Sequence, residues 1–446
     1  MKRKLLGVLL SVTMVASMLV GCGGGGDDKA ADTKTEDTKA EDTAKDDAAA
    51  DDTKDDAAGD TAASGDGLVY WSMWESGEAQ AIAIQKVLDA YTEETGIPVE
   101  VQWKGRDINK VIAAALEAGE KIDLFDEDYQ RVGEQYADLC MDLEDMAKAA
   151  DYENHAVAAF PTAMRGWAGS LKGIAYQAYT SGIFYNKAIF EEAGVEKEPQ
   201  TWAEFLDVCQ KIKDAGYAPL ALDDAYAVYN YGYQIARYMG EDAVKELTMN
   251  GGWADNEQAK KATQDIVDFL AAGYLSEDAP GAYPENENTI GYDETAMIVN
   301  ASWVPAEITN QTQCDIQWGM FNYPSVDGGK DPNTVANVGA QAFAIPKYSE
   351  KGQEAFDLIM KIATGEGDQA IALETNSIPA DPTNEEWPEI IAGCKDAFNA
   401  LTGVYEWNCG LNKNQNIKEE LNTNILKLFE GEYDTDGFLK AMDGLY

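Results

Sequence analysis

Between residues 68 and 125 the spacing of apolar side chains switches repeatedly between strand and helix periods, and this restricts the fold more than any other feature of the chain. Strand-like stretches occur at residues 68–71, 97–103 and 122–125. Between them, apolar side chains three and four positions apart predict helices around residues 84–91 and 108–116, ending at Gly96 and Gly119. Strands that alternate with helices favour parallel pairing through right-handed crossovers, so we expect an α/β fold.

A second α/β unit follows the first. The stretch 173–187 contains two short strand-like runs. Thr201 and Glu204 have the spacing of a capping box, and the helix that they begin should end at Gly216. A further strand is expected at residues 217–222, and further helices at 258–272 and 352–364. Two α/β units joined by extended crossing segments suggest a hinged pair of lobes with a cleft.

The N-terminus has the pattern of a secretion signal. Three basic residues, Lys2 to Lys4, precede the apolar stretch 5–18, which is short for a membrane span of ~20 residues. The alternative is an uncleaved N-terminal membrane helix. Leu19-Val20-Gly21-Cys22 resembles a bacterial lipobox, which implies that residues 1–21 are removed and that Cys22 is lipidated. The mature protein is then expected on the extracellular face of the cell membrane, anchored through lipid.

Residues 23–66 contain no aromatic residue and no Val, Ile, Leu or Met. Their charge comes from 13 Asp and 2 Glu against 5 Lys. A segment with so little to bury is expected to be a disordered acidic linker between Cys22 and the folded part.

Charge and composition exclude several classes of function. The chain has a formal net charge of −46, which argues against binding to nucleic acid and is best explained by solubility. The single histidine, His155, excludes a multi-histidine metal site, and a surface or capping role is preferred for it. No cofactor is expected. Among the cysteines after Cys22, Cys209 should pack in a core, and a Cys394–Cys409 disulfide is one alternative for that pair.

Several stretches in order along the chain resemble one family, the extracellular solute-binding proteins of bacterial ABC transporters, in the carbohydrate-binding group that includes maltose-binding protein. The most specific is GIFYNKAIFEEAGVEKEPQTWAEFLDVCQKIKDAG, which resembles the family's "YNK..F...G...P.TW.EF" segment. The others are EETGIPVEV, ALEAGEKIDLF, ETAMIVNASW, VGAQAFAIPK and NSIPA. The sequence departs from the family at Lys121-Ile122, where proline is usual, and at Ala301, where glycine is common.

The resemblance implies a two-lobed type II periplasmic-binding-protein fold with a hinge. Lobe 1 would comprise residues 67–176 and 337–376, and lobe 2 residues 177–336 and 377–446. Ligand would bind between the lobes and close them about the hinge. The family implies no enzymatic activity.

Position relative to the strands predicts the first ligand-binding residues, because ligands of open α/β sheets bind beyond the carboxyl ends of strands. The residues that end or follow strands are Trp74, Glu75, Asp126, Asp128, Asp223 and Asp224. For Trp74 and Glu75 the alternative is a helix-capping turn with a packed tryptophan. For Asp126 and Asp128 it is an acidic first turn of a helix.

The family resemblance adds further residues. Gln177 and Tyr179 lie in the segment that resembles the family's "Y.lP" stretch, with Ala178 in place of proline. Trp303 matches a tryptophan that commonly stacks on sugar, although packing in the core is the alternative. Gln341 lies at a crossover and could reach the cleft. Trp407 is added from its neighbours alone, since it lies between Glu406 and Asn408 in an expected loop.

The 10 Trp and 22 Tyr residues favour an oligosaccharide of a few units over a monosaccharide, because rings cover the apolar faces of sugars. We therefore expect a monomeric carbohydrate receptor that delivers its ligand to an ABC permease. Two other classes of function remain open at this point. One is a secreted glycoside hydrolase, which also combines rings with paired carboxylates. The other is a receptor for a cationic ligand or a peptide.

Overall fold

The computed structural model describes residues 67–446, so the predicted signal peptide, Cys22 and the acidic linker lie outside the described residues. Nine strands form one hydrogen-bonded network within the described part. They are β1 (Leu68–Ser72), β2 (Val99–Trp103), β3 (Leu124–Asp128), β4 (Ile174–Asn186), β5 (Ala218–Ala221), β6 (Thr295–Ala301), β7 (Trp318–Phe321), β8 (Val335–Ala344) and β9 (Gly403–Tyr405). Their order is β2-β1-β3-β8-β4-β6-β5, with β7 paired to β4 and β9 to β8.

The N-terminal helices are α1 (Ala79–Thr95), α2 (Ile108–Ala118), α3 (Tyr129–Arg131), α4 (Glu144–Ala149), α5 (Ala159–Ala168) and α6 (Lys187–Glu192). They include the two that were predicted, α1 and α2. Both α1 and α2 end at a glycine in the left-handed conformation, Gly96 and Gly119, as predicted. The pairings of β1 with β2 and with β3 are parallel, so the first α/β unit is confirmed.

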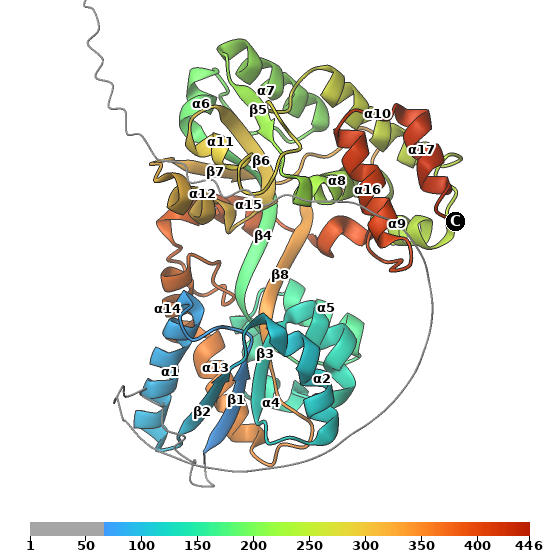
Figure 1. The fold of residues 1–446 in the computed structure, drawn as a ribbon. Helices are drawn as coiled ribbons and strands as arrows, with labels where there is room; N and C mark the ends of the chain where they lie inside the picture. Colours follow the sequence, from blue (N-terminus) through green and yellow to red (C-terminus); the bar gives the residue numbers. More distant parts are fainter. Residues whose placement is uncertain (1–66) are drawn as a thin grey trace, which may run out of the picture. The chain divides into compact units, whose positions relative to one another are not determined.

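The remaining helices are α7 (Trp202–Ala215), α8 (Ala227–Met239), α9 (Glu241–Asn250), α10 (Glu257–Ala271), α11 (Asn288–Gly291), α12 (Val304–Thr312), α13 (Gly352–Ala363), α14 (Gly365–Thr375), α15 (Lys395–Asn399), α16 (Lys418–Phe429) and α17 (Thr435–Asp443). Of these, α13 and α14 pack beside α1 of the first α/β unit, and most of the others cover the second half of the sheet (Figure 1). The capping box is confirmed, because the Thr201 hydroxyl accepts the Glu204 N–H and the Glu204 carboxylate accepts the Thr201 N–H.

Two long strands, β4 and β8, run between the group of elements around β1, β2 and β3 and the group around β5, β6 and β7 (Figure 1). The prediction of two short strands in 173–187 was wrong, because the segment forms the continuous strand β4. Its first half pairs with β8 and its second half with β6 and β7. A register shift between Tyr176 and Tyr179 interrupts the β4–β8 pairing, and Gln177 there has a φ of 48°. This β-bulge turns the strand where it passes from one group to the other.

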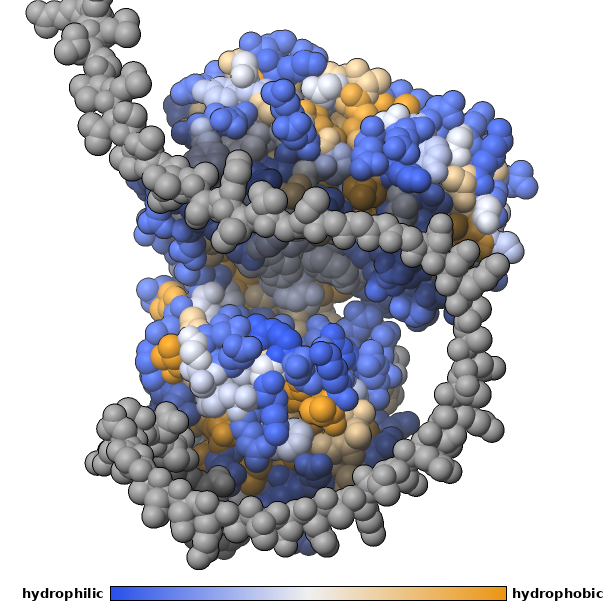
Figure 2. Space-filling view, in the orientation of Figure 1, coloured by the Kyte–Doolittle hydropathy of each residue, from blue (hydrophilic) through white to orange (hydrophobic). Residues whose placement is uncertain are grey.

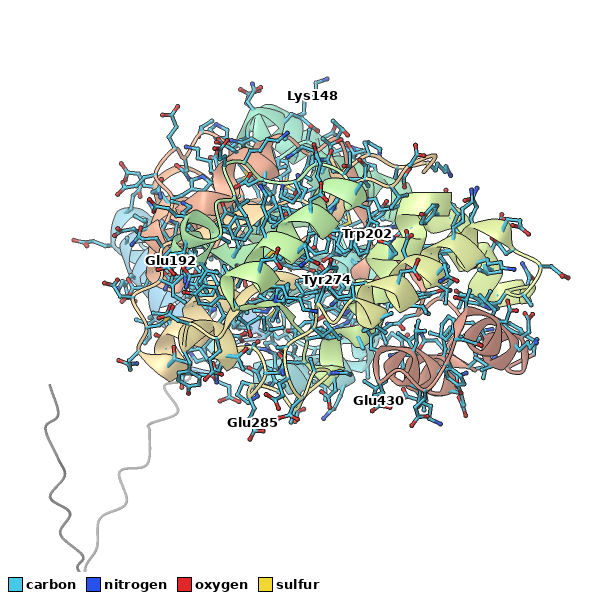
Figure 3. All side chains as sticks on the ribbon, turned by 90° about the horizontal axis from the view of Figure 1, so that it is seen from above. Lys148, Glu192, Trp202, Tyr274, Glu285 and Glu430 are labelled. Carbon is cyan, nitrogen blue, oxygen red and sulfur yellow. The ribbon has the colours of Figure 1, made fainter. Side chains whose placement is uncertain are left out.

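The buried apolar residues form two clusters rather than one core. The first is built largely on β1, β3, α1, α2 and α13, and the second on α7, α8, α10, α16 and α17. Trp202 and Tyr274 of the second cluster lie among the helices in Figure 3, whereas Glu192, Glu285 and Glu430 lie at the periphery. Two cores agree with two lobes, but the predicted lobe boundaries stay a prediction.

The described cysteines are all free, so the Cys394–Cys409 disulfide is excluded in this structure. Both thiols are buried, each in a different apolar cluster. Cys209 is fully buried in the second cluster, as predicted. Within residues 67–446 no helix combines the length and apolarity needed to cross a membrane. The face shown in Figure 2 is predominantly hydrophilic, which fits the high net charge.

Candidate ligand-binding site

A cavity of about 1040 Å³, here called the main cavity, lies where β3, β4 and β8 meet the N-terminus of α12 and the segment after β9. Seven of the eleven predicted ligand-binding residues line it: Trp74, Asp128, Gln177, Tyr179, Trp303, Gln341 and Trp407. Ligand cavities in proteins reach ~1,000 Å³, so the main cavity has room for a ligand of several rings.

Three aromatic rings follow one another along the main cavity. The Trp303 ring lies 5.2 Å from the Tyr179 ring in an edge-to-face contact and 6.0 Å from the Trp407 ring, centroid to centroid. Trp407 in turn stacks on the buried Tyr229 at 4.5 Å. Tyr179, Trp303 and Trp407 are each partly exposed, so none of them is simply a core residue. Such a row presents apolar ring surface to a ligand.

Local backbone features hold this row in place. Gly339 on β8 is needed beside Tyr179, because a Cβ at that position would lie 2.2 Å from the Tyr179 hydroxyl. Trp407 begins the short helical segment Trp407–Gly410, in which Asn408 and Cys409 both have positive φ angles. Gly232 on α8 lets this segment approach closely, since a Cβ there would lie 2.7 Å from the Asn408 carbonyl oxygen.

Polar groups of the main cavity are left without partners within the described residues. These buried atoms are Gln177 Oε1, Gln341 Oε1, Glu307 Oε2 and Asn412 Oδ1. Each of these atoms is a hydrogen-bond acceptor. A buried acceptor without a donor is energetically unfavourable, and a ligand hydroxyl that donated to it would remove this penalty. Gln177 is placed by the β-bulge, and Gln341 lies opposite Asp128 of β3 and Tyr176 of β4.

Trp74 is held by a buried network below the main cavity. Its indole N–H donates to the Tyr176 hydroxyl at 2.6 Å, and that hydroxyl donates to Asp126 Oδ2 at 2.5 Å. The guanidinium of Arg106 lies 4.3 Å from the Trp74 ring centroid and covers one face. Trp74 is only 5% exposed and yet lines the main cavity. It is therefore packed, as the alternative had it, and also contributes surface to the main cavity.

Asp126 does not line the main cavity, which corrects its predicted role as a ligand contact. It is fully buried and accepts from the Tyr70 hydroxyl and the Met73 N–H as well as from Tyr176. Burial raises the pKa of Asp126 to about 6, although these hydrogen bonds oppose the rise. Asp126 therefore positions Trp74 through Tyr176.

Asp128 both caps a helix and lines the main cavity. Its carboxylate accepts the Arg131 N–H at 2.9 Å and so caps α3, which agrees with the alternative of an acidic first helical turn. The residue nevertheless lines the main cavity and is only partly buried. Burial raises its pKa.

Three other predicted residues lie elsewhere. Glu75 is exposed, and its N–H is engaged by the Glu78 carboxylate. Asp223 is fully buried and accepts the Glu287 N–H at 3.1 Å, and Asp224 is exposed beside it. None of the three lines the main cavity. The rule that ligands lie beyond strand ends selected residues near the main cavity, but it did not distinguish those that line it from the buried Asp126 and Asp223 or the exposed Glu75 and Asp224.

Sequence reasoning missed several residues of the main cavity. Glu307 lies one helical turn after Trp303, so its position on the same side of α12 could have been inferred from spacing. Arg106 and Asn412 carried no such signal. Within the described residues, no group of three or more His, Cys, Asp and Glu side chains is placed to hold a metal ion.

Comparison with known proteins was made against family models, curated proteins and solved structures. The model of the family described as bacterial extracellular solute-binding protein matches residues 86–394. A multiple sugar-binding protein from Streptococcus mutans is 33% identical over 221 residues, which is 46% of this chain and 51% of that protein. An sn-glycerol-3-phosphate-binding periplasmic protein from Rhizobium meliloti is 23% identical over 37% of this chain and 39% of that protein.

These curated relatives are each matched over less than two thirds of their own length. Among solved structures, the apo form of RafE from Streptococcus pneumoniae superposes with a TM-score of 0.69 at 19% identity, covering 85% of this chain and 97% of that chain. At this identity the structural likeness shows the fold, and it confirms the predicted α/β fold class.

Proposed function

The chain belongs to the family of bacterial extracellular solute-binding proteins, and from this membership we propose that it binds a neutral oligosaccharide in the main cavity. The family consists of binding proteins rather than enzymes, so glycoside hydrolysis is not proposed. The ligand would then pass to the permease of an ABC transporter.

One observation carries the choice of ligand: a row of aromatic rings beside unpartnered amide oxygens. Tyr179, Trp303 and Trp407 offer surface to the apolar faces of sugar rings. Gln177 and Gln341 offer acceptors to hydroxyl groups. A sugar needs both kinds of contact at once, and the length of the row suits more than one ring.

Charged rival ligands would use other groups of the main cavity. Carboxylates that could receive a cation line it at Glu134 and Glu307, and ammonium groups that could receive glycerol phosphate, suggested by one relative, line it at Lys413 and Lys418. A cation could also lie over one ring face, but glycerol phosphate has no apolar ring to place against three rings in a row. The proposal of a neutral oligosaccharide therefore rests on the aromatic row together with the unpartnered amide oxygens, and a screen against all three kinds of ligand decides between them.

The proposal is tested by a thermal-shift screen of the purified protein against neutral mono- and oligosaccharides, with spermidine, sn-glycerol 3-phosphate and a short peptide in parallel. A ligand that binds the native state raises the melting temperature. We expect a shift with one class of glycan. Titration calorimetry should then show that Trp303→Ala weakens binding of that glycan by about 100-fold, as expected for an aromatic hot spot.

Trp387→Ala is the matched control, because Trp387 is also partly exposed but does not line the main cavity. It should leave the affinity unchanged. If only spermidine, glycerol phosphate or peptide raises the melting temperature, the carbohydrate proposal is wrong. If Trp303→Ala and Trp387→Ala weaken binding equally, the ligand does not bind on the aromatic row.

The proposal includes attachment to the membrane through lipid on Cys22, which rests on the sequence pattern around that residue. Fractionation of cells that express the full chain would test it. The wild type should be recovered with membranes, and Cys22→Ala should not. Equal recovery of both would contradict lipid attachment without affecting the assignment of the ligand.

A further inference from the structure

A second cavity of about 220 Å³, here called the side pocket, lies next to the main cavity. The two cavities share five lining residues: Asp128, Gln130, Tyr179, Glu406 and Trp407. The rest of the side pocket is formed by α5, by β8 around Gly339 and by the start of α9. It therefore adjoins the aromatic row at Tyr179 and Trp407.

Small residues keep the side pocket open. Ala159 and Ala163 of α5 face Gly339 and Ala340 of β8 across it. Protein interiors are normally packed to near-crystalline density, and an empty space of this size lowers stability. Larger apolar side chains at the alanine positions would fill it. Gly339 must also be small because the Tyr179 ring approaches it closely.

The lining of the side pocket has the two components of a sugar subsite. Phe160 and Trp167 form an aromatic wall in addition to Tyr179 and Trp407. Opposite them, the Lys245 ammonium is held between the carboxylates of Glu241 and Glu406.

The charge of the side pocket selects against anions. Three carboxylates, those of Asp128, Glu241 and Glu406, line it with one ammonium group, that of Lys245. A phosphate or a uronic acid would meet a net negative wall. A neutral ring could instead place its hydroxyl groups against the fixed charges and its apolar face against Phe160 or Trp167.

We propose that the side pocket is a separate subsite that takes one neutral sugar ring, at the end or at a branch of the oligosaccharide bound in the main cavity. This inference rests on the proposed function and adds to it that the protein prefers a ligand longer than the main row of rings can hold. Occupancy of the side pocket would supply the additional affinity for longer ligands.

The test is to fill the side pocket from a wall that the main cavity does not use. Ala163→Phe adds a ring from α5 at a position that lines the side pocket and a neighbouring cavity but not the main cavity. Gly166→Phe is the matched control, because it adds the same ring on the same helix at a position with no atom within 4 Å of a new Cβ. Affinities are measured by calorimetry for malto-, xylo- and chito-oligosaccharides of increasing length.

In the glycan series that binds the wild type, we expect affinity to rise with length. Ala163→Phe should remove this rise and weaken the longest ligand by about ten-fold or more, while the shortest binds within about two-fold of the wild type. Gly166→Phe should follow the wild type at every length. Melting temperatures of the two variants, measured without ligand, show whether either has failed to fold, and a smaller replacement, Ala163→Leu, then takes the place of Ala163→Phe.

Two results would overturn the subsite while leaving the proposed function intact. One is that Ala163→Phe has no effect at any length, which would mean that the ligand does not enter the side pocket. The other is that it weakens all lengths equally, which would mean that it distorts the main cavity. If no glycan binds the wild type, the proposed function fails and the subsite fails with it.

Discussion

One fully buried aspartate, Asp126, lies within β3 and another, Asp223, follows β5, and their hydrogen-bond partners differ. Asp126 accepts hydrogen bonds from Tyr70, Tyr176 and the Met73 N–H, which occupy both carboxylate oxygens. Asp223 accepts one hydrogen bond, from the Glu287 N–H, and its Oδ2 has no partner among the described residues. Instead, Asp223 lies next to the Glu287 carboxyl, which is also fully buried.

The comparison shows that the neighbours of a buried carboxyl group, and not burial alone, decide its charge. Burial raises the pKa of both groups. At Asp126 three donors oppose the rise, and its pKa stays near 6. The pKa of Asp223 is also raised to about 6, with hydrogen bonds from Glu287 opposing the rise, whereas burial and the neighbouring Asp223 carboxylate raise the pKa of Glu287 to about 9. We therefore expect Asp126 to be ionised near neutral pH and the pair to hold a proton.

The largest expected effect comes from removing the Asp126 carboxylate, since both of its oxygens accept hydrogen bonds. Asp126→Ala leaves two tyrosine hydroxyls and the Met73 N–H without their acceptor, and it should lower the free energy of unfolding by about 3 kcal/mol. Ligand affinity should fall as well, because Trp74 is oriented through Tyr176. Denaturant unfolding measures the first effect and calorimetry the second.

The control for this substitution is Asp224→Ala, which removes an exposed carboxylate and should change stability by less than about 0.5 kcal/mol. Asp126→Asn should lie between the two, because the amide keeps one acceptor oxygen. A loss of stability in Asp126→Ala no larger than that in Asp224→Ala would show that the network contributes little.

The same two aspartates explain how far the sequence could predict the site. Helix ends at Gly96 and Gly119 and the capping box at Thr201 were predictable, because each depends on residues a few positions apart. Trp303 was predictable from the family resemblance, and it lines the main cavity. Asp126 could not be separated from Asp128 in this way, since residues two positions apart face the same side of a strand and only their place along β3 differs.

Other parts of the site depend on contacts between distant segments. The bulge at Gln177 arises where β4 changes its pairing partners, and no local motif marks it. Trp407 reaches the aromatic row because Gly232, far away in sequence, allows its segment to approach α8. The side pocket lies between α5, β8 and α9, and its alanines have no distinctive pattern in the sequence. Long-range packing of this kind has no short-range signature.

The second prediction concerns the buried carboxyl groups of Asp223 and Glu287. Glutamate ordinarily releases its proton near pH 4.5, and the folded protein holds the Glu287 proton to a higher pH. As pH rises above the ordinary value, the unfolded chain binds fewer protons than the folded one, so the stability of the wild type should fall. Glu287→Gln removes this titration and keeps a group that can donate to Asp223. We expect its melting temperature to exceed that of the wild type by a few degrees at about pH 9, with little difference at about pH 5.

Melting curves of both proteins across this pH range provide the measurement. Asp126→Asn is the comparison, because Asp126 completes its titration at lower pH, near 6. A difference between Glu287→Gln and the wild type that does not vary with pH would mean that the pair does not hold a proton, and that some cation outside the chain compensates its charge.

The smallest expected effect concerns Arg106, whose guanidinium covers one face of the Trp74 ring. The Arg106 guanidinium lies over Trp74, is paired with Glu78 and donates to the Met73 carbonyl oxygen at 2.7 Å, so three interactions hold it. Arg106→Gln should weaken ligand binding by about two-fold, since a half-exposed cation over a ring contributes about 0.5 kcal/mol. Glu78→Gln removes the ion pair and leaves the cation over the ring, so it should change affinity even less. If Glu78→Gln reproduces the full effect of Arg106→Gln in calorimetry, the ion pair orients the arginine and the ring contact alone does not. The Asp126 network would then support Trp74 only from the inner side.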